Sequence, residues 1–178
     1  MLKILFTRHG TTDLNELDLI QGQIERPLNE KGREDARKLA LRLKDEKIDL
    51  IYCSTLGRAI ETAEIVRGDR DIKIIQDKRI IEQYYGSMEG MPRTSKEYRL
   101  QRQSHFKRYP GGGEGYLDVC QRVFNFFDEL KEKYDNMTIL VVAHGGMSRL
   151  VDCYFGDLEN EEFTNHSMPN CGLKIFEY

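Results

Sequence analysis

The order in which strand-like and helix-like segments alternate is the feature that most constrains the fold of this 178-residue chain. The most strand-like run is TILVVA at 138–143, and a helical pattern from about Gly146 to Tyr154 follows it. Shorter strand-like runs occur at 2–6, 49–53, 72–75 and 173–176. Strands that alternate with helices and have β-branched cores predict an α/β fold, a three-layer sandwich with a mainly parallel central sheet flanked by helices.

Apolar residues at helical spacing predict three more helices. The first follows Asn29, a residue type that caps helix N-termini, and the second is expected to be capped by Ser54 or Thr55. The third is longer, starts near Glu114, and has an apolar face that includes Val119, Val123, Phe126, Phe127 and Leu130. No internal repeat and no linker divides the chain, so residues 1–178 are expected to form a single domain.

The segment at about 86–113 fits the alternating pattern poorly. It has glycines at both ends, and between Arg93 and Arg108 its only acidic residue is Glu97, among several lysines and arginines. We interpret the segment as an excursion over the edge of the sheet, a lid-like insertion. Its basic residues could contact a second anionic group of a substrate, or form the solvated face of a helix.

Composition and charge exclude several classes of protein. The net charge of −3 argues against a general nucleic-acid or membrane binder, since both favour a basic excess. No run approaches the roughly 20 apolar residues that span a bilayer, and the apolar N-terminus is too short for a signal peptide. We therefore expect a cytoplasmic protein, whose oligomeric state cannot be read from the sequence. The cysteines are far apart, without CxxC or metal-ligand spacing, and we expect free thiols, buried at Cys53 and Cys171.

Cationic and imidazole side chains follow three of the predicted strands. The first strand leads into Arg8 and His9, the second leads through Gly57 to Arg58, and the strongest ends at His144. Ligands of open α/β sheets bind outside the carboxyl ends of the strands, so these residues are expected to share one site. Two arginines and two histidines make an anion site, and phosphate suits the fixed donor geometry of arginine.

Backbone groups are expected to add to this site. The helix N-termini after Thr55 and Gly145 would supply N–H donors to a bound phosphate. His105 and His166 do not follow a predicted strand, so we expect both to be structural or surface residues.

Four blocks of sequence resemble those of the histidine phosphatase superfamily, which also contains cofactor-dependent phosphoglycerate mutases. They are RHGTTDLN at 8–15, STLGRAIETA at 54–63, the acid-bearing segment from Ile81 to Gly90, and VVAHGG at 141–146. Arg-His-Gly alone is a weak signal, but the four blocks occur in order and the match covers about residues 2–176. The resemblance implies a phosphoglycerate mutase-like fold.

The resemblance also implies a mechanism. His9 would attack phosphorus and form a phosphohistidine, which water then hydrolyses, while Arg8, Arg58 and His144 stabilise the negative charge. Glu82 matches the acid of the family that protonates the leaving group, with Glu89 as the competing candidate. These roles describe a metal-independent phosphoric monoester hydrolase of the histidine acid phosphatase type. We expect no metal and no cofactor, because the side chains supply the charge and no carboxylate cluster suits magnesium.

Further residues are candidates for binding the substrate, which is expected to be a small phosphorylated metabolite. Asn15, Gln21 and Gly22 match positions that contact phosphate or substrate in relatives. Tyr85 and Gly145 are additional candidates.

Two alternatives to hydrolysis stay open. A mutase returns the phosphoryl group to its substrate, but mutases of the family are usually longer between the acid and the last histidine, and Thr11-Thr12 stands here where they have Glu-Ser. A non-catalytic domain that binds a phosphorylated ligand is the other alternative. Small members of the family include α-ribazole phosphatases and broad-specificity phosphatases, and the sequence does not choose among substrates.

Overall fold

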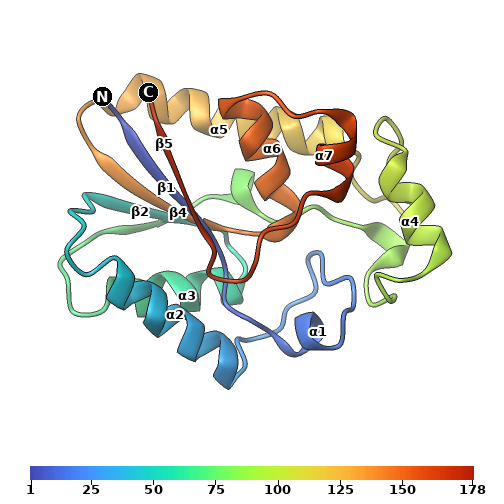
Figure 1. Cartoon of the computed structure of the whole chain (residues 1–178), viewed down its shortest axis with the longest axis horizontal. Helices are drawn as coiled ribbons and strands as arrows, with labels where there is room; N and C mark the ends of the chain where they lie inside the picture. The colour runs from blue at the N-terminus through green and yellow to red at the C-terminus, as the bar shows by residue number, and fades with distance from the viewer.

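The computed structural model describes all 178 residues and has a five-stranded sheet at its centre (Figure 1). The strand order is β3-β2-β4-β1-β5, in which β1, β2, β3 and β4 run parallel and β5 lies antiparallel at the edge. The elements are β1 (Lys3–Arg8), α1 (Asp13–Glu16), α2 (Glu30–Arg42), β2 (Leu50–Cys53), α3 (Gly57–Arg67), β3 (Ile74–Gln76), two 3₁₀ turns (Lys78–Ile80 and Gly86–Met88), α4 (Lys96–Gln103), α5 (Tyr116–Lys133), β4 (Thr138–Ala143), α6 (Gly145–Phe155), α7 (Asn160–Asn165) and β5 (Leu173–Glu177).

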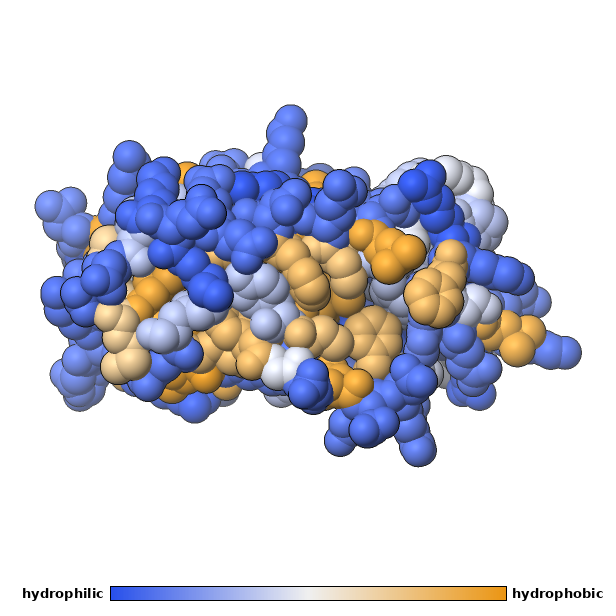
Figure 2. Space-filling model, turned by 90° about the horizontal axis from the view of Figure 1, so that it is seen from above, coloured by the Kyte–Doolittle hydropathy of each residue, from blue (hydrophilic) through white to orange (hydrophobic).

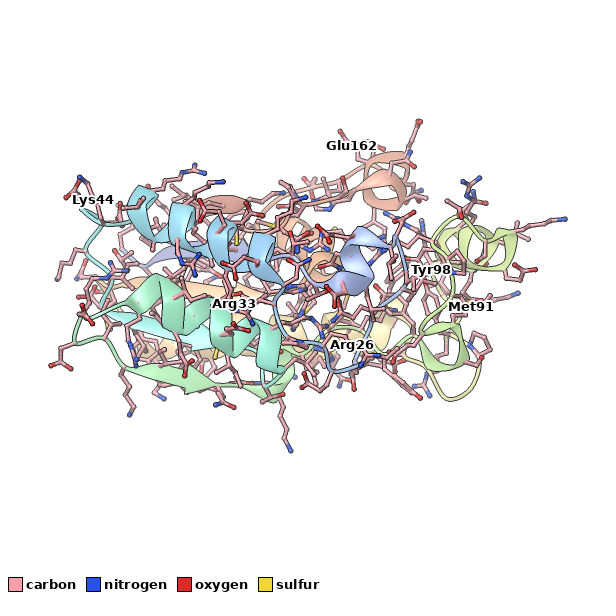
Figure 3. The ribbon with its side chains drawn as sticks, turned by 90° about the horizontal axis from the view of Figure 1, so that it is seen from below. Arg26, Arg33, Lys44, Met91, Tyr98 and Glu162 are labelled. Carbon is pink, nitrogen blue, oxygen red and sulfur yellow. The ribbon has the colours of Figure 1, made fainter.

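Helices cover both faces of the sheet, which confirms the predicted three-layer α/β fold. In Figure 1, α5 and α6 lie above the sheet and α2 and α3 lie below it. Figure 3 shows Arg33 between the two lower helices. From α2 it donates to Glu61 on α3 at 2.6 Å. The mainly parallel sheet therefore has two dry faces, as its continuous apolar strands require.

The strands divide the core into two parts because successive side chains point to opposite faces. Ile4 and Phe6 pack with α5 and α6, whereas Leu5 packs with α2 and α3. All three side chains are fully buried. Burying such a side chain contributes about 1.5–3 kcal/mol, so β1 is held firmly in register at the centre of the molecule.

Apolar and aromatic side chains reach the surface above the sheet, framed by hydrophilic residues (Figure 2). Among the half-buried ones, Phe155 at the end of α6 stacks on Phe176 of β5 with ring centroids 4.1 Å apart, and Tyr178 lies beside both. None of the helices is both long enough and apolar enough to cross a membrane.

Some helix and strand boundaries differ from those predicted. Asn29 caps α2 as expected, through its side chain and the Gly32 N–H. The cap predicted at Ser54 or Thr55 is wrong: α3 begins at Gly57, and the carboxylate of Glu25 accepts the Gly57 N–H at 3.2–3.3 Å. Glu25, which is distant in sequence, thus accepts the N–H that a capping residue next to the helix would otherwise accept. A local sequence pattern cannot reveal such a contact. The third strand is also shifted by two residues, to Ile74–Gln76, and α5 begins at Tyr116.

The segment 86–113 does not lie over an edge of the sheet, as we had expected, but beyond the carboxyl ends of its strands, where α4 stands apart from the other helices (Figure 1). Tyr109 packs edge-on against Tyr85 at 4.9 Å, and Tyr98 packs against both rings. At the base of the segment Gly86 has φ of +58°, and a Cβ there would lie 1.9 Å from the Pro110 oxygen, so only glycine fits. The segment is therefore packed at the end of the sheet where the predicted site lies.

The cysteines are free thiols, as predicted. Cys53 is fully buried, whereas Cys171 is half-buried rather than buried. Burial raises the pKa of each of these two thiols to about 12, so both stay protonated at neutral pH.

Candidate active site

The pairing of β1 with β4 brings the two predicted catalytic histidines together. Arg8 pairs with Ala143 in the parallel register, so the next residues, His9 and His144, leave the sheet side by side. The His9 N–H donates to the Ala143 carbonyl at 3.0 Å, and the two imidazole rings lie 5.1 Å apart. Both rings are buried, and neither nitrogen of His144 has a hydrogen-bond partner within the protein.

One nitrogen of His9 is oriented as a nucleophile. Its Nδ1 lies 2.7 Å from the Gly10 carbonyl, which can only accept a hydrogen bond, so Nδ1 carries the proton. Nε2 therefore holds the free electron pair, and Arg58 donates to it through Nε at 3.1 Å. Arg58 is itself fixed by donating to the carbonyls of Ile24 and Gly22, at 3.0 and 2.6 Å. A buried arginine with three such bonds is held for a purpose other than surface solvation.

The charges around the histidines keep them neutral. Burial and the cations of Arg58 and Arg8 hold the pKa of His9 well below its usual value of 6.5, although the Gly10 carbonyl acts in the opposite direction. Burial and Arg58 likewise hold the pKa of His144 well below 6.5. Burial and the nearby charge of Arg93 lower the pKa of Arg8 to about 10, which leaves the guanidinium positive at neutral pH. A neutral imidazole beside two cations is the state that nucleophilic attack on an anion requires.

The neutral state of these histidines predicts how folding depends on pH. Below pH 6.5 the unfolded chain binds protons at His9 and His144 that the folded chain does not bind. Stability is therefore fully present above pH 6.5 and falls below it, by up to about 1.4 kcal/mol per pH unit for each histidine. We expect His144→Gln to reduce the slope of the unfolding free energy against pH by up to about 1.4 kcal/mol per pH unit, the contribution of one proton. Urea unfolding between pH 7.5 and 5 measures this slope. Equal slopes in the two proteins would contradict a neutral, buried His144.

A pocket has Arg8, Glu82, Tyr85 and Gly145 on its wall. Arg8 and Gly145 are the sequence neighbours of His9 and His144, but the two histidines and Arg58 do not themselves line it. Arg8 donates to the Met168 carbonyl at 2.7 Å, and its buried Nε has no partner within the protein. The carboxylate of Glu82 accepts the N–H of Gly146 at 3.0 Å, and a Cβ on Gly146 would lie 2.5 Å from both Glu82 Oε1 and the Tyr85 hydroxyl. The glycine thus leaves room for an acid and a phenol to meet at the start of α6.

Glu89 is placed differently from Glu82. Its Oε1 accepts the N–H groups of Gln23 and Tyr85, at 2.8 and 3.2 Å, and its side chain lies where a Cβ of Gly22 would be. Burial raises its pKa, but it is not on the wall of the pocket. The geometry favours Glu82 over Glu89 as the group that can reach a ligand.

The remaining candidate residues surround the site without lining the pocket. Gln21 and Asn15 bond to each other, with Nδ2 of Asn15 lying 3.4 Å from Oε1 of Gln21. Gly22, with φ of +52°, presents its carbonyl to Arg58. Asn170, which our sequence reasoning missed, joins Asn15 to His9 by donating to the His9 carbonyl at 2.9 Å and to Asn15 Oδ1 at 3.1 Å. No local pattern singles out Asn170, because its contacts are made across 155 and 161 residues.

One expectation about the helix N-termini needs correction. The N–H groups of Gly57 in α3 and Gly146 in α6 already have partners in the protein, because Glu25 accepts the first and Glu82 accepts the second. His166, expected to be a structural or surface residue, pairs with Asp152 at 2.5 Å and also lies on the wall of the pocket. His105 is structural as expected, and packs against Tyr116 and Phe163. No group of three or more His, Cys, Asp or Glu side chains is arranged to hold a metal ion.

Comparison with known proteins agrees with this geometry. Residues 4–178 match the sequence profile of the histidine phosphatase superfamily, branch 1. The chain belongs to this superfamily, which confirms the family identified from the four sequence blocks.

Individual relatives match over nearly the whole chain. The structure of YhfR from Bacillus stearothermophilus is 34% identical with a TM-score of 0.88, over 99% of this chain and 91% of that one. The α-ribazole phosphatase of Shigella flexneri is 27% identical with a TM-score of 0.82, over 97% and 89%. Among curated proteins, phosphoserine phosphatase 1 of Hydrogenobacter thermophilus is 28% identical over 98% of this chain and 86% of its own length. Proteins named phosphoglycerate mutases also match, so the family alone does not decide between hydrolysis and transfer.

Proposed function

We propose that this chain hydrolyses phosphate monoesters through a phosphohistidine on His9. The observation that carries the proposal is the state of the His9 ring, whose Nδ1 proton is bonded to the Gly10 carbonyl and whose Nε2 electron pair faces a buried guanidinium. Such a ring is a nucleophile beside a binding site for the anion it attacks.

In the first step, Nε2 of His9 attacks phosphorus while the bond from phosphorus to the ester oxygen breaks. The Arg58 N–H that now bonds Nε2 must turn to a phosphoryl oxygen, because the attacking electron pair has to be free. Arg8 Nε and the single N–H of the neutral His144 ring are buried donors without protein partners that can bind the other oxygens. Fixed donors of this kind typically contribute about 10²–10³-fold each to the rate. Glu82, in its protonated form, gives its proton to the departing oxygen.

In the second step, water attacks the phosphohistidine. The Glu82 carboxylate left by the first step takes a proton from that water, phosphate is released, and Nε2 regains its electron pair. Glu82 is suited to both steps because it lines the pocket with Arg8. We assign the classification as a metal-independent, histidine acid phosphatase-type hydrolase on this scheme.

Phosphate release decides between the candidate functions. The purified chain should release inorganic phosphate from a panel of monoesters and should not interconvert 2- and 3-phosphoglycerate at a comparable rate. Faster interconversion than release would make it a mutase. A stable phosphorylated complex without any turnover would make it a binding domain.

Glu82→Gln should impair substrates in proportion to how much their leaving groups need a proton. We expect alkyl phosphates to lose about 10²–10⁴-fold in kcat/KM, the usual contribution of a general acid, and nitrophenyl phosphate to lose much less. The measurement is kcat/KM for both substrates in the variant and the parent chain.

Glu89→Gln is the matched control, since it neutralises the competing acid a short distance away. It should change both substrates by the same factor. If Glu82→Gln also lowered both substrates equally, or if only Glu89→Gln discriminated between them, Glu82 would not be the proton donor.

We also propose that residues 86–113 act as a lid within a single domain. Its arginines Arg93 and Arg102 line the pocket that holds Arg8 and Glu82. Arg102 donates to the His166 carbonyl at 2.8 Å, so a contact to the loop after α7 holds the segment over the site.

A further inference from the structure

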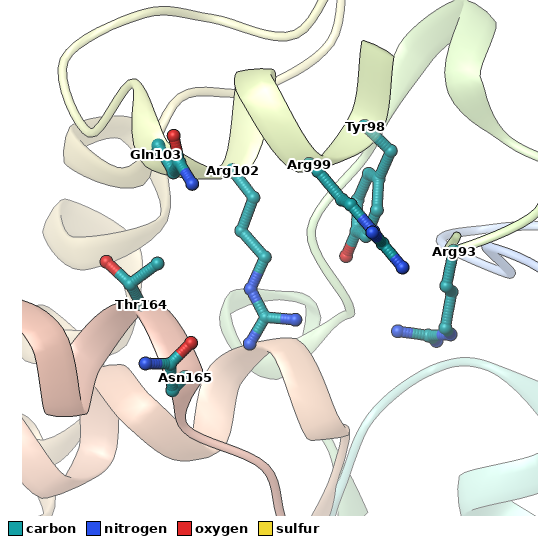
Figure 4. Close-up of a pocket in the computed structure, with 7 residues that line it drawn as sticks. All are labelled: Arg93, Tyr98, Arg99, Arg102, Gln103, Thr164 and Asn165. Carbon is teal, nitrogen blue, oxygen red and sulfur yellow. The ribbon is translucent and has the colours of Figure 1, made fainter. Parts of the chain in front are cut away.

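The pocket with Arg8 and Glu82 on its wall carries more positive charge than a single phosphate needs. Four arginines line it, Arg8, Arg93, Arg102 and Arg149, against the single carboxylate of Glu82. The pocket has a volume of about 60 Å³, and a wider one of about 280 Å³ lies between α4 and α7, with Arg93 and Arg102 on the walls of both (Figure 4). The two pockets are therefore neighbours that share two arginines, and the smaller one has Arg8, the residue before His9, on its wall.

Arg149, on α6, is buried without an acidic partner. Its side chain is 5% exposed, its Nε has no hydrogen-bond partner, and Nη1 reaches only the Tyr116 hydroxyl and the Phe163 carbonyl, at 3.3 and 3.4 Å. The guanidinium lies over the rings of these two residues, at 5.6 and 5.5 Å. A buried cation without a counter-charge is costly, and an anion entering the pocket would lower that cost.

The two lid arginines are also largely free to bind a ligand. The nearest acid to the Arg93 guanidinium is Asp18, at 3.9 Å. The positive charge of Arg93 contributes to lowering the pKa values of Arg8 and His9. Arg102 contacts no acid: one nitrogen donates to the His166 carbonyl, and its buried Nε has no partner. In Figure 4 the Arg102 side chain runs from α4 toward Asn165, with Arg93 on the opposite side of the pocket.

A count of charges then indicates the kind of substrate. A phosphoryl dianion is matched by Arg8 and Arg58. This leaves Arg93, Arg102 and Arg149 with Glu82 as the only acid on the pocket wall and Asp18 3.9 Å from Arg93. We propose that these three arginines bind a second anionic group, a carboxylate or a second phosphate, on the same small substrate molecule. This inference rests on the proposed phosphatase function and adds the class of substrate to it.

Matched pairs of substrates test the proposal. 3-Phosphoglycerate and glycerol 3-phosphate differ only in a carboxylate that replaces a hydroxymethyl group, and fructose 1,6-bisphosphate and fructose 6-phosphate differ in a second phosphate. We expect the parent chain to prefer the more anionic member of at least one pair by about 10-fold or more in kcat/KM, as for a charge-assisted contact. The pair that shows the preference identifies the second group as carboxylate or phosphate.

Arg93→Gln and Arg102→Gln should each lower that preference ratio by about 10-fold. The matched control is Lys96→Gln, which removes one positive charge from an exposed position on α4 outside both pockets, and should leave the ratio within about twofold. Circular dichroism and thermal unfolding check that each variant folds. If loss of the Arg102 bond to the His166 carbonyl loosens the lid, the Arg93→Gln variant still tests the preference ratio.

Three outcomes would overturn the proposal: a parent ratio near one for both pairs, a ratio unchanged in both arginine variants, or an equal change in Lys96→Gln. In each of these cases phosphate is still released, so the phosphatase function stands. Absence of phosphate release from all four compounds and from nitrophenyl phosphate would instead remove the proposed function, and this inference with it.

Discussion

The His9→Ala variant will lose hydrolysis of phosphate monoesters by at least about 10⁴-fold, because removal of a nucleophile leaves only binding and electrostatic contributions. The phosphoenzyme should disappear with it. Nε2 of His9 is the imidazole nitrogen with its electron pair fixed toward a buried guanidinium, and His144 offers no equivalent orientation, since neither of its nitrogens has a protein partner. Steady-state hydrolysis of nitrophenyl phosphate, and mass spectrometry of the enzyme quenched in base during turnover, measure the two effects.

His105→Ala is the control for this variant. It removes an imidazole that packs against Tyr116 and Phe163 and is not part of the site, so activity should stay within about threefold, the range of a surface substitution. A His9→Ala protein that kept a labelled phosphohistidine would assign the nucleophile to another histidine.

The Arg58→Met variant is expected to show the second largest effect, about 10³-fold in kcat/KM, the loss typical of a fixed donor that stabilises transition-state charge. The substitution keeps a long apolar stem in a buried place but removes donors to Nε2 of His9 and to the carbonyls of Ile24 and Gly22. It also removes a cation that lowers the pKa of His9.

The pH profile of this variant separates catalysis from folding. Loss of the Arg58 charge raises the pKa of His9 toward 6.5, so more of the ring is protonated in mild acid and the acid limb of kcat/KM moves to higher pH. In the parent chain we expect this limb at lower pH, because burial, Arg58 and Arg8 lower the pKa of His9.

The Arg33→Met variant is the matched control, because it removes a guanidinium that pairs with Glu61 across the surface of α2 and α3. We expect its activity and its acid limb to match those of the parent, since such a pair contributes about 1 kcal/mol or less to stability. An Arg58→Met protein that lost activity without moving its acid limb would show that Arg58 acts on the substrate but not on His9.

The local sequence pattern was sufficient to predict most of the fold. The apolar run at 138–143 is too rich in β-branched residues for a surface helix, and its alternation with amphipathic segments leaves a covered, mainly parallel sheet as the physical solution. Local pattern failed where a distant group replaced a local one. The start of α3 is an example, because Glu25 rather than Ser54 or Thr55 satisfies its first N–H.

For the candidate site, the sequence identified the residues that the strand ends carry. His9 and His144 come together because β1 and β4 are neighbours in register, and Arg58 reaches them from the first turn of α3. Asn170 and Arg149 were missed because their side chains meet the site only through contacts across the molecule. The sequence also could not show which nitrogen of His9 holds the proton, since that depends on the position of one carbonyl.

The sequence by itself thus determined the class of fold, the family, and the set of cations and imidazoles at one rim of the sheet, because strand periodicity and strand-end position are local properties. The tertiary structure alone decided the tautomer and neutrality of His9, the position of Glu82 rather than Glu89 on the pocket wall, and the position of residues 86–113 beyond the strand ends. These depend on burial and on distances between residues far apart in the chain. The same reason applies to the basic stretch from Arg93 to Arg108, which the sequence left undecided and which the structure brings to the pocket through Arg93 and Arg102.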